Sequence, residues 1–126
     1  MDKRTVELQD RLIDYAVRVM SLVAVLPDSV AGRHIAGQLL RSGTSPAPNY
    51  GEAVSSESRN DFVHKVQIAL KELRESDVWL KIIIRSKMIE DPERMIPLVK
   101  ETDELISILV ASARTARRNN ENNRQS

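Results

Sequence analysis

The sequence predicts an all-α protein that folds as an antiparallel up-down-up-down four-helix bundle. Apolar residues recur every three or four positions along four segments, which is the spacing of one helix face. The chain has 126 residues, enough for one domain with a single core. Aromatic residues make up only 3% of it, so the core must consist mainly of Leu, Ile, Val and Ala. Short connections between the four segments favour antiparallel neighbours.

The first predicted helix covers residues 4–26, and Pro27 with the polar residues after it ends that helix. The second covers residues 29–54, with Gly32 and Gly37 as candidate points of close helix contact. We expect this helix to be kinked or broken near residues 43–46. There Ser45 can cap a helix whose first residue is Pro46, where proline loses only an N–H group that has no acceptor.

The third predicted helix covers residues 58–87 and begins with Ser58 as its cap. The fourth covers residues 92–117, after an Asp-Pro pair that suits a helix start. Together the four helices form one domain over residues 1–118. Residues 119–126 lose apolar content and are rich in Asn, so we expect a disordered polar tail.

Composition excludes several classes of function. There is no Cys, so disulfide scaffolds and thiolate chemistry are excluded, and a reducing compartment fits. No run approaches the about 18 apolar residues of a membrane span, and the N-terminus is unlike a signal peptide, which indicates a soluble cytoplasmic protein. Asp61 and His64 only approximate the Glu-x-x-His pair of a di-iron bundle. With no catalytic or phosphate-loop motif either, we expect no metal, no cofactor and no enzymatic activity.

Two polar residues, Asn49 and Glu52, follow the predicted kink and are flanked by apolar turns. Side chains at such positions can point inward, where they need hydrogen-bond partners. One interpretation is structural, with these groups tying down the kink. The other is a polar cavity that binds a small molecule or a peptide.

Basic residues provide the candidate nucleic-acid contacts. The overall charge is only +1, so any basic surface must be local. The segment 114–126 is one-sided, with four Arg against one Glu. The candidate phosphate contacts are Arg33, Arg41, Arg114, Arg117 and Arg118.

The third predicted helix carries more apolar surface than a single bundle seam requires. Ile68, Trp79 and Ile82 lie on a flank beside its main stripe. Exposed apolar patches of this kind mark interaction sites. We therefore expect a homo-oligomer whose interface includes these three residues.

Two stretches of the chain together resemble a known family. They are LLRSGTSPAPNYGEA and DFVHKVQIALKELRESDVWLKII, and their most specific parts are Arg-Ser-Gly-Thr-Ser, Asn-Tyr-x-Glu-Ala and Ile-Ala-Leu-Lys-Glu leading to Trp-Leu. The resemblance, over most of residues 5–115, is to the bacterial four-helix bundle family associated with intervening sequences in 23S ribosomal RNA genes. Pro46 and Pro48 depart from its pattern, because relatives carry helix-compatible residues there.

The resemblance implies a small cytoplasmic all-α protein similar to relatives that form homopentameric rings. It also implies kinship with the basic accessory protein of diversity-generating retroelements, which binds a reverse transcriptase and nucleic acid. The net charge of +1 lacks the strongly basic character of that branch. The expected function is a non-enzymatic oligomeric scaffold with RNA or a nucleoprotein as candidate partner. The alternative is a bundle that binds a small molecule or peptide near the kink.

Overall fold

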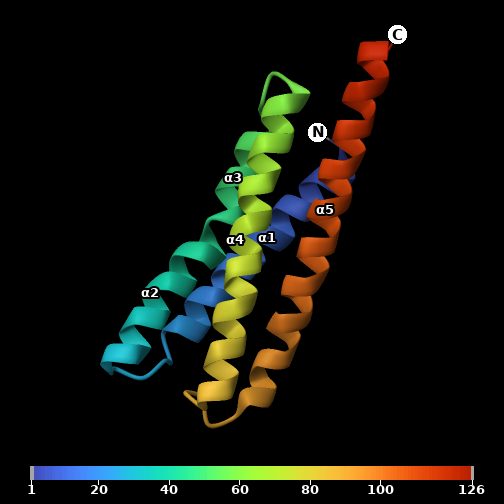
Figure 1. Ribbon diagram of the computed structural model, residues 1–126. Helices are drawn as coiled ribbons and strands as arrows, with labels where there is room; N and C mark the ends of the chain where they lie inside the picture. The colour runs from blue at the N-terminus through green and yellow to red at the C-terminus, as the bar shows by residue number, and fades with distance from the viewer. Residues whose placement is uncertain (1, 126) are drawn as a thin grey trace.

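The structure, a computed structural model, describes residues 2–125 and the side chains of residues 2–123. Within that range all regular structure is helical, and no strand is present. The elements in chain order are α1 (Lys3–Val23), α2 (Val30–Thr44), α3 (Pro46–Val54), α4 (Arg59–Ser86), the 3₁₀-helix η1 (Pro92–Met95) and α5 (Ile96–Gln125). With α2 and α3 counted as one broken helix, this is the predicted four-helix arrangement (Figure 1).

The four long segments surround one core. α1 packs against α2, α3 and α5, and α4 packs against the same three elements from the opposite side of the bundle. α1 and α4 are therefore diagonal, and in Figure 1 α4 lies in front with α1 behind it. Their fully buried side chains are mostly aliphatic, as the composition predicts, and include Leu12, Val19, Leu39, Leu73, Leu80, Ile83, Leu105 and Leu109. None of the helices within residues 2–125 combines the length and apolar character needed to cross a lipid bilayer.

The second predicted helix is broken at Ser45, inside the predicted range. Ser45 itself keeps helical angles, with φ −69° and ψ −36°, and its side chain does not cap α3. The expectation of a capping serine was therefore wrong at this position. Pro46 and Pro48 cause the break, because neither has an N–H group to donate to the preceding turn. The Ser45 N–H still donates to the carbonyl of Arg41 at 3.1 Å, so α2 and α3 continue in nearly one direction.

The close contact between α1 and α2 occurs at Gly43, which was not predicted. A Cβ atom on Gly43 would lie 2.7 Å from a methyl group of Val19. By contrast, Gly37 faces open space, and a Cβ atom added there would have no neighbouring atom within 4 Å. A Cβ atom on Gly32 would meet the carbonyl of Pro27 and the hydroxyl of Ser29, both in the turn before its own helix. Neither predicted glycine therefore brings two helices together.

A small polar layer crosses the otherwise apolar core. The Tyr15 hydroxyl lies 2.8 Å from Thr102 Oγ1, and Ser76 Oγ donates to Ser42 Oγ at 2.8 Å. All four side chains are fully buried, and they come from α1, α2, α4 and α5. The hydroxyl groups satisfy one another or a carbonyl of their own helix, as when Thr102 donates to Leu98 at 2.8 Å. Buried polar groups with partners favour one register of the helices over alternatives.

The prediction of a disordered C-terminal tail needs correction. α5 continues as helix through Gln125, whereas we expected disorder over residues 119–126. Asn120 Nδ2 donates to Asn60 Oδ1 at 3.0 Å, which ties these turns to the start of α4. We predicted disorder because this segment has no apolar side chains to bury. A helix that is already nucleated, however, adds each further residue at little cost in free energy. Ser126, like Met1, lies outside the described residues.

Candidate nucleic-acid interface

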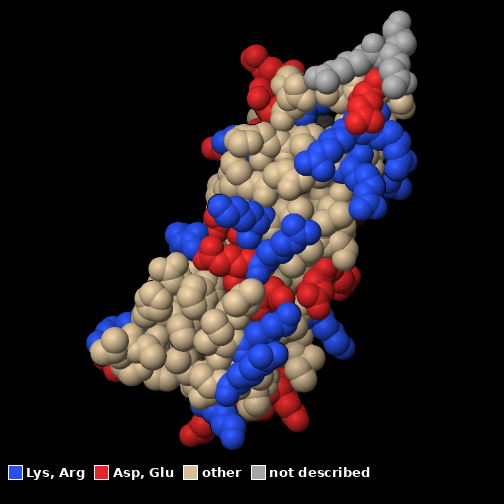
Figure 2. Space-filling model, viewed as in Figure 1, with Lys and Arg blue, Asp and Glu red and all other residues tan. Residues whose placement is uncertain are grey.

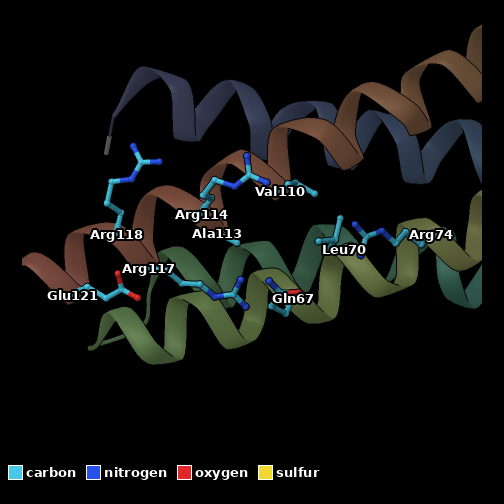
Figure 3. Close-up of a pocket in the computed structure, with 9 residues that line it drawn as sticks. All are labelled: Gln67, Leu70, Arg74, Val110, Ala113, Arg114, Arg117, Arg118 and Glu121. Atoms are coloured by element: carbon cyan, nitrogen blue, oxygen red, sulfur yellow. The ribbon is translucent and has the colours of Figure 1, made fainter.

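A groove of about 470 Å³ runs between α4 and α5 near the end of the bundle that holds the α3–α4 connection (Figure 3). Its floor is apolar, with Leu70 and Ala113 buried beneath it. Its rim is polar and basic. The rim residues are Gln67 and Arg74 from α4, and Arg114, Arg117, Arg118 and Glu121 from α5.

The rim carries a strong local excess of positive charge. Four arginines face one glutamate, a local net charge of +3 in a chain whose total is +1. All four arginines are exposed, and within the described residues none lies within 4.0 Å of a carboxylate oxygen. Figure 2 shows basic side chains gathered over this part of α5. The guanidinium groups therefore remain available to an external anion.

The arginines point in different directions around the groove. In Figure 3, Arg117 extends across the groove toward Gln67, whereas Arg114 and Arg118 extend to the other side of α5. Helix geometry explains this spread, because successive residues of an α-helix are turned by about 100°. The four groups therefore present a broad basic surface rather than one pocket for a single small anion.

Two of the five predicted arginine contacts lie elsewhere and are already paired. Arg33 Nη1 lies 2.7 Å from an oxygen of Asp28. Arg41 binds Glu72 at 2.7 Å and also pairs with Glu75. Slight burial lowers the pKa of Arg41, but these two carboxylates outweigh it and raise the pKa overall. Of the five, only Arg114, Arg117 and Arg118 form one surface. Arg74 and Gln67 of α4, which are not among the five, lie beside them.

Asn49 and Glu52 are both engaged within the protein. Asn49 Nδ2 donates to the carbonyl of Ser45 at 3.0 Å and to its hydroxyl at 2.9 Å, so it bridges the break between α2 and α3. Glu52 is exposed, and its carboxylate accepts from Lys65 Nζ at 2.7 Å. Neither side chain lines the groove between α4 and α5. These contacts favour the structural interpretation of the two residues.

The three predicted interface residues lie in different surroundings. Trp79 is half-buried, its indole N–H donates to Glu75 at 3.0 Å, and its ring meets that of His34 edge-on with centroids 6.0 Å apart. Ile68 is also half-buried, whereas Ile82 is exposed. A larger set of exposed apolar residues on α1 was not predicted: Val6, Ile13, Val17 and Met20. Their spacing of seven, four and three would have revealed a second helix face.

The near match to a di-iron motif has no partners in the described part of the chain. Asp61 and His64 are both exposed on the first turns of α4. Among residues 2–125, no group of three or more His, Asp or Glu side chains is placed to hold a metal ion.

The chemistry of the groove suits phosphate groups. A guanidinium is planar and can donate two parallel hydrogen bonds to a phosphate. No aromatic side chain of the described residues lines the groove, so stacking on bases has no platform there. The arrangement can therefore hold a polyanion by its backbone, without reading its bases.

Comparison with known proteins places this architecture in a family. The family model described as 23S rRNA-intervening sequence protein matches residues 4–111. The chain belongs to that family. The match contains all of α1 to α4 except the first residue of α1, and about the first half of α5, but it ends before Arg114, Arg117 and Arg118. The arginines on α5 therefore lie beyond the segment that the family model describes.

A solved structure has the same fold as this chain. It is a crystal structure of a protein with unknown function from the S23 ribosomal protein family of Bacteroides thetaiotaomicron VPI-5482. The two chains are 33% identical, the alignment covers 84% of this chain and 97% of the other, and the TM-score is 0.78. No curated protein matches the chain.

Proposed function

We propose that this protein is a non-enzymatic, self-associating scaffold of the cytoplasm that binds RNA, free or within a nucleoprotein, through the basic groove between α4 and α5. The observation that carries the proposal is the set of four exposed arginines on the rim, none of which has a carboxylate within 4.0 Å among the described residues. Membership in a family named for an rRNA intervening sequence supports the choice of RNA.

Recognition through such a groove is electrostatic and independent of sequence. Contacts to phosphate position a protein on nucleic acid but do not distinguish bases. One groove with four arginines is a weak site by itself. Self-association would place several grooves on one assembly, so that a long RNA binds them together and the overall affinity rises by multivalency.

Salt dependence is the first test of this proposal. With up to four phosphates neutralised, the logarithm of the affinity for single-stranded RNA should fall with the logarithm of salt with a slope near −3. Raising salt fourfold should then weaken binding roughly 50-fold. A filter-binding titration with total cellular RNA measures this slope. Binding that does not respond to salt, or no binding at low salt, contradicts the proposal.

Two charge-matched variants locate the site. R114Q/R117Q/R118Q removes three charges from the groove, whereas R33Q/R94Q/K100Q removes three charges from exposed positions elsewhere. We expect the groove variant to lose at least tenfold in RNA affinity and the control to change by less than about threefold, because only the first set acts together on one surface. Equal losses in the two variants would show that net charge, rather than the groove, holds the RNA.

A further inference from the structure

An apolar stripe on α1 faces solvent without a partner in the bundle. Its members lie at a spacing of seven, four and three residues, on the side of α1 turned away from the core. The exposed fractions are 43% for Val6, 45% for Ile13, 55% for Val17 and 55% for Met20. Fourteen residues at about 1.5 Å each give the stripe a length of about 21 Å.

Acidic residues run along this stripe. Asp10 lies one helical turn from both Val6 and Ile13, and Asp14 lies one turn before Val17. Glu7 precedes Asp10 by one turn. All three carboxylates are exposed, and among the described residues none pairs with a cation within 4.0 Å. One exposed cation, Lys3, lies one turn before Glu7, so three carboxylates and one ammonium group leave the α1 face apolar and net negative.

The outer face of α4 has the opposite charge. Val78 is 54% exposed and Ile82 is 37% exposed. Lys71 precedes Val78 by seven residues and Arg85 follows it by seven, so both lie on the same face. Arg74 precedes Val78 by four and lies at the edge of this face, where it belongs to the rim of the groove. Each is exposed and has no carboxylate within 4.0 Å among the described residues. This α4 face is apolar and positive, and from Lys71 to Arg85 it also spans about 21 Å.

We propose that the α1 face of one copy of this chain packs against the α4 face of a second copy. The proposal rests on the self-association included in the proposed function and names the two surfaces that make it. Apolar area meets apolar area of the same length, and carboxylates meet ammonium and guanidinium groups. An α1 face against another α1 face, or an α4 face against another α4 face, would bring like charges together at a cost.

The two faces cannot meet within one chain, because α1 and α4 are diagonal in the bundle. In Figure 1 they lie behind and in front, respectively. A contact between two different faces is heterologous, so every added copy presents a free face to the next one. Such contacts give a closed ring if the rotation closes and an open chain if it does not.

Two variants, each blocked on one face, test this pairing. I13K/V17K places positive charge in the α1 stripe, and V78E/R85E places negative charge on the α4 face. All four positions are exposed and Arg74 is unchanged, so the fold and the RNA groove should remain. Each variant alone should be monomeric by native mass spectrometry, with helicity by circular dichroism equal to that of the unaltered chain. The control V30K/I96K changes two other exposed apolar residues and should assemble normally.

Mixing the two variants is the decisive step. Each variant keeps the face that the other has lost, so an equimolar mixture should form a one-to-one heterodimer that stops there. The proposal is overturned if either variant alone still forms dimers, or if both keep the size of the unaltered assembly. It is also overturned if the mixture stays monomeric at ten times the concentration at which the unaltered chain assembles.

The same samples separate this inference from the proposed function. If the unaltered chain is monomeric at every concentration, self-association fails, and this pairing fails with it. If the chain assembles but the two variants do not behave as described, only the pairing of faces fails. RNA binding to the monomeric variants, measured by filter assay, reports on the groove independently of both outcomes.

Discussion

The hydroxyl of Tyr15 donates a hydrogen bond of 2.8 Å to Thr102 Oγ1 and so links the first helix to the last across the core. The direction follows from proton counting. The single hydroxyl hydrogen of Thr102 is used in its bond to the carbonyl of Leu98, so its oxygen can only accept from Tyr15.

Replacing Thr102 with Val should destabilise the protein by about 1–3 kcal/mol, because it leaves the buried Tyr15 hydroxyl without this acceptor. Chemical denaturation measures the change. Thr115→Val is the matched control, since Thr115 is exposed on the same helix and should change stability by less than about 0.5 kcal/mol. The double variant Y15F/T102V should recover part of the lost stability, because it removes the unpaired hydroxyl as well. A double variant whose destabilisation equals the sum of the two single changes would contradict this account.

Stability should also fall at high pH through Tyr15. Burial, only partly offset by hydrogen bonds with Thr102 and Ser76, raises the pKa of Tyr15 from 10.0 to about 12. The folded state holds the proton more tightly than the unfolded state. The free energy of unfolding therefore keeps its full value below pH 10 and falls between pH 10 and about 12. The slope is at most about 1.4 kcal/mol per pH unit. Subtracting the pH profile of Y15F isolates the effect, and identical profiles would disprove it.

Two glycines of the same helix should respond oppositely to alanine. Gly43→Ala places a methyl group 2.7 Å from Val19, so α1 and α2 must separate, at a cost of about 1–3 kcal/mol. Gly37→Ala meets no atom within 4 Å and should stabilise the helix by about 0.5–1 kcal/mol. Thermal unfolding followed by circular dichroism compares them directly. A Gly43 variant as stable as the Gly37 variant would mean that the helices are less tightly packed there.

Asn49 should stabilise the protein at the break between α2 and α3. Asn49→Ala removes both hydrogen bonds to Ser45 and should cost about 1 kcal/mol. Glu52→Gln weakens only an exposed ion pair with Lys65 and should cost less than about 0.5 kcal/mol. If Asn49 instead served a ligand site, its removal would leave stability unchanged.

The periodicity of apolar residues predicted the helices well, because a spacing of three to four residues can be read within each segment alone. Pro46 and Pro48 located the break for the same reason, since the missing N–H groups are local. Gly43 could not be predicted in this way, because its importance depends on where α2 meets Val19.

The residues of the groove could likewise be predicted only in part from the sequence. Its basic character on α5 was visible in the segment after Arg114. The sequence could not assign Arg74 to the same surface, because it lies 40 positions before Arg114 and becomes its neighbour only when α4 packs against α5. Ion pairs likewise depend on packing. Because α2 lies beside α4, Arg41 pairs with Glu72 and Glu75 and is not available as a phosphate contact.

The long C-terminal end of α5 has a consequence for how RNA binding would be observed. Beyond Ala116 every residue with a described side chain is exposed or half-buried, so little tertiary structure opposes fraying of these turns. Their amide protons should exchange with solvent faster than those near Leu105, which is fully buried. A polyanion on Arg117 and Arg118 would hold those turns closed. Slowed exchange confined to this end of the helix would then locate the ligand without any substitution.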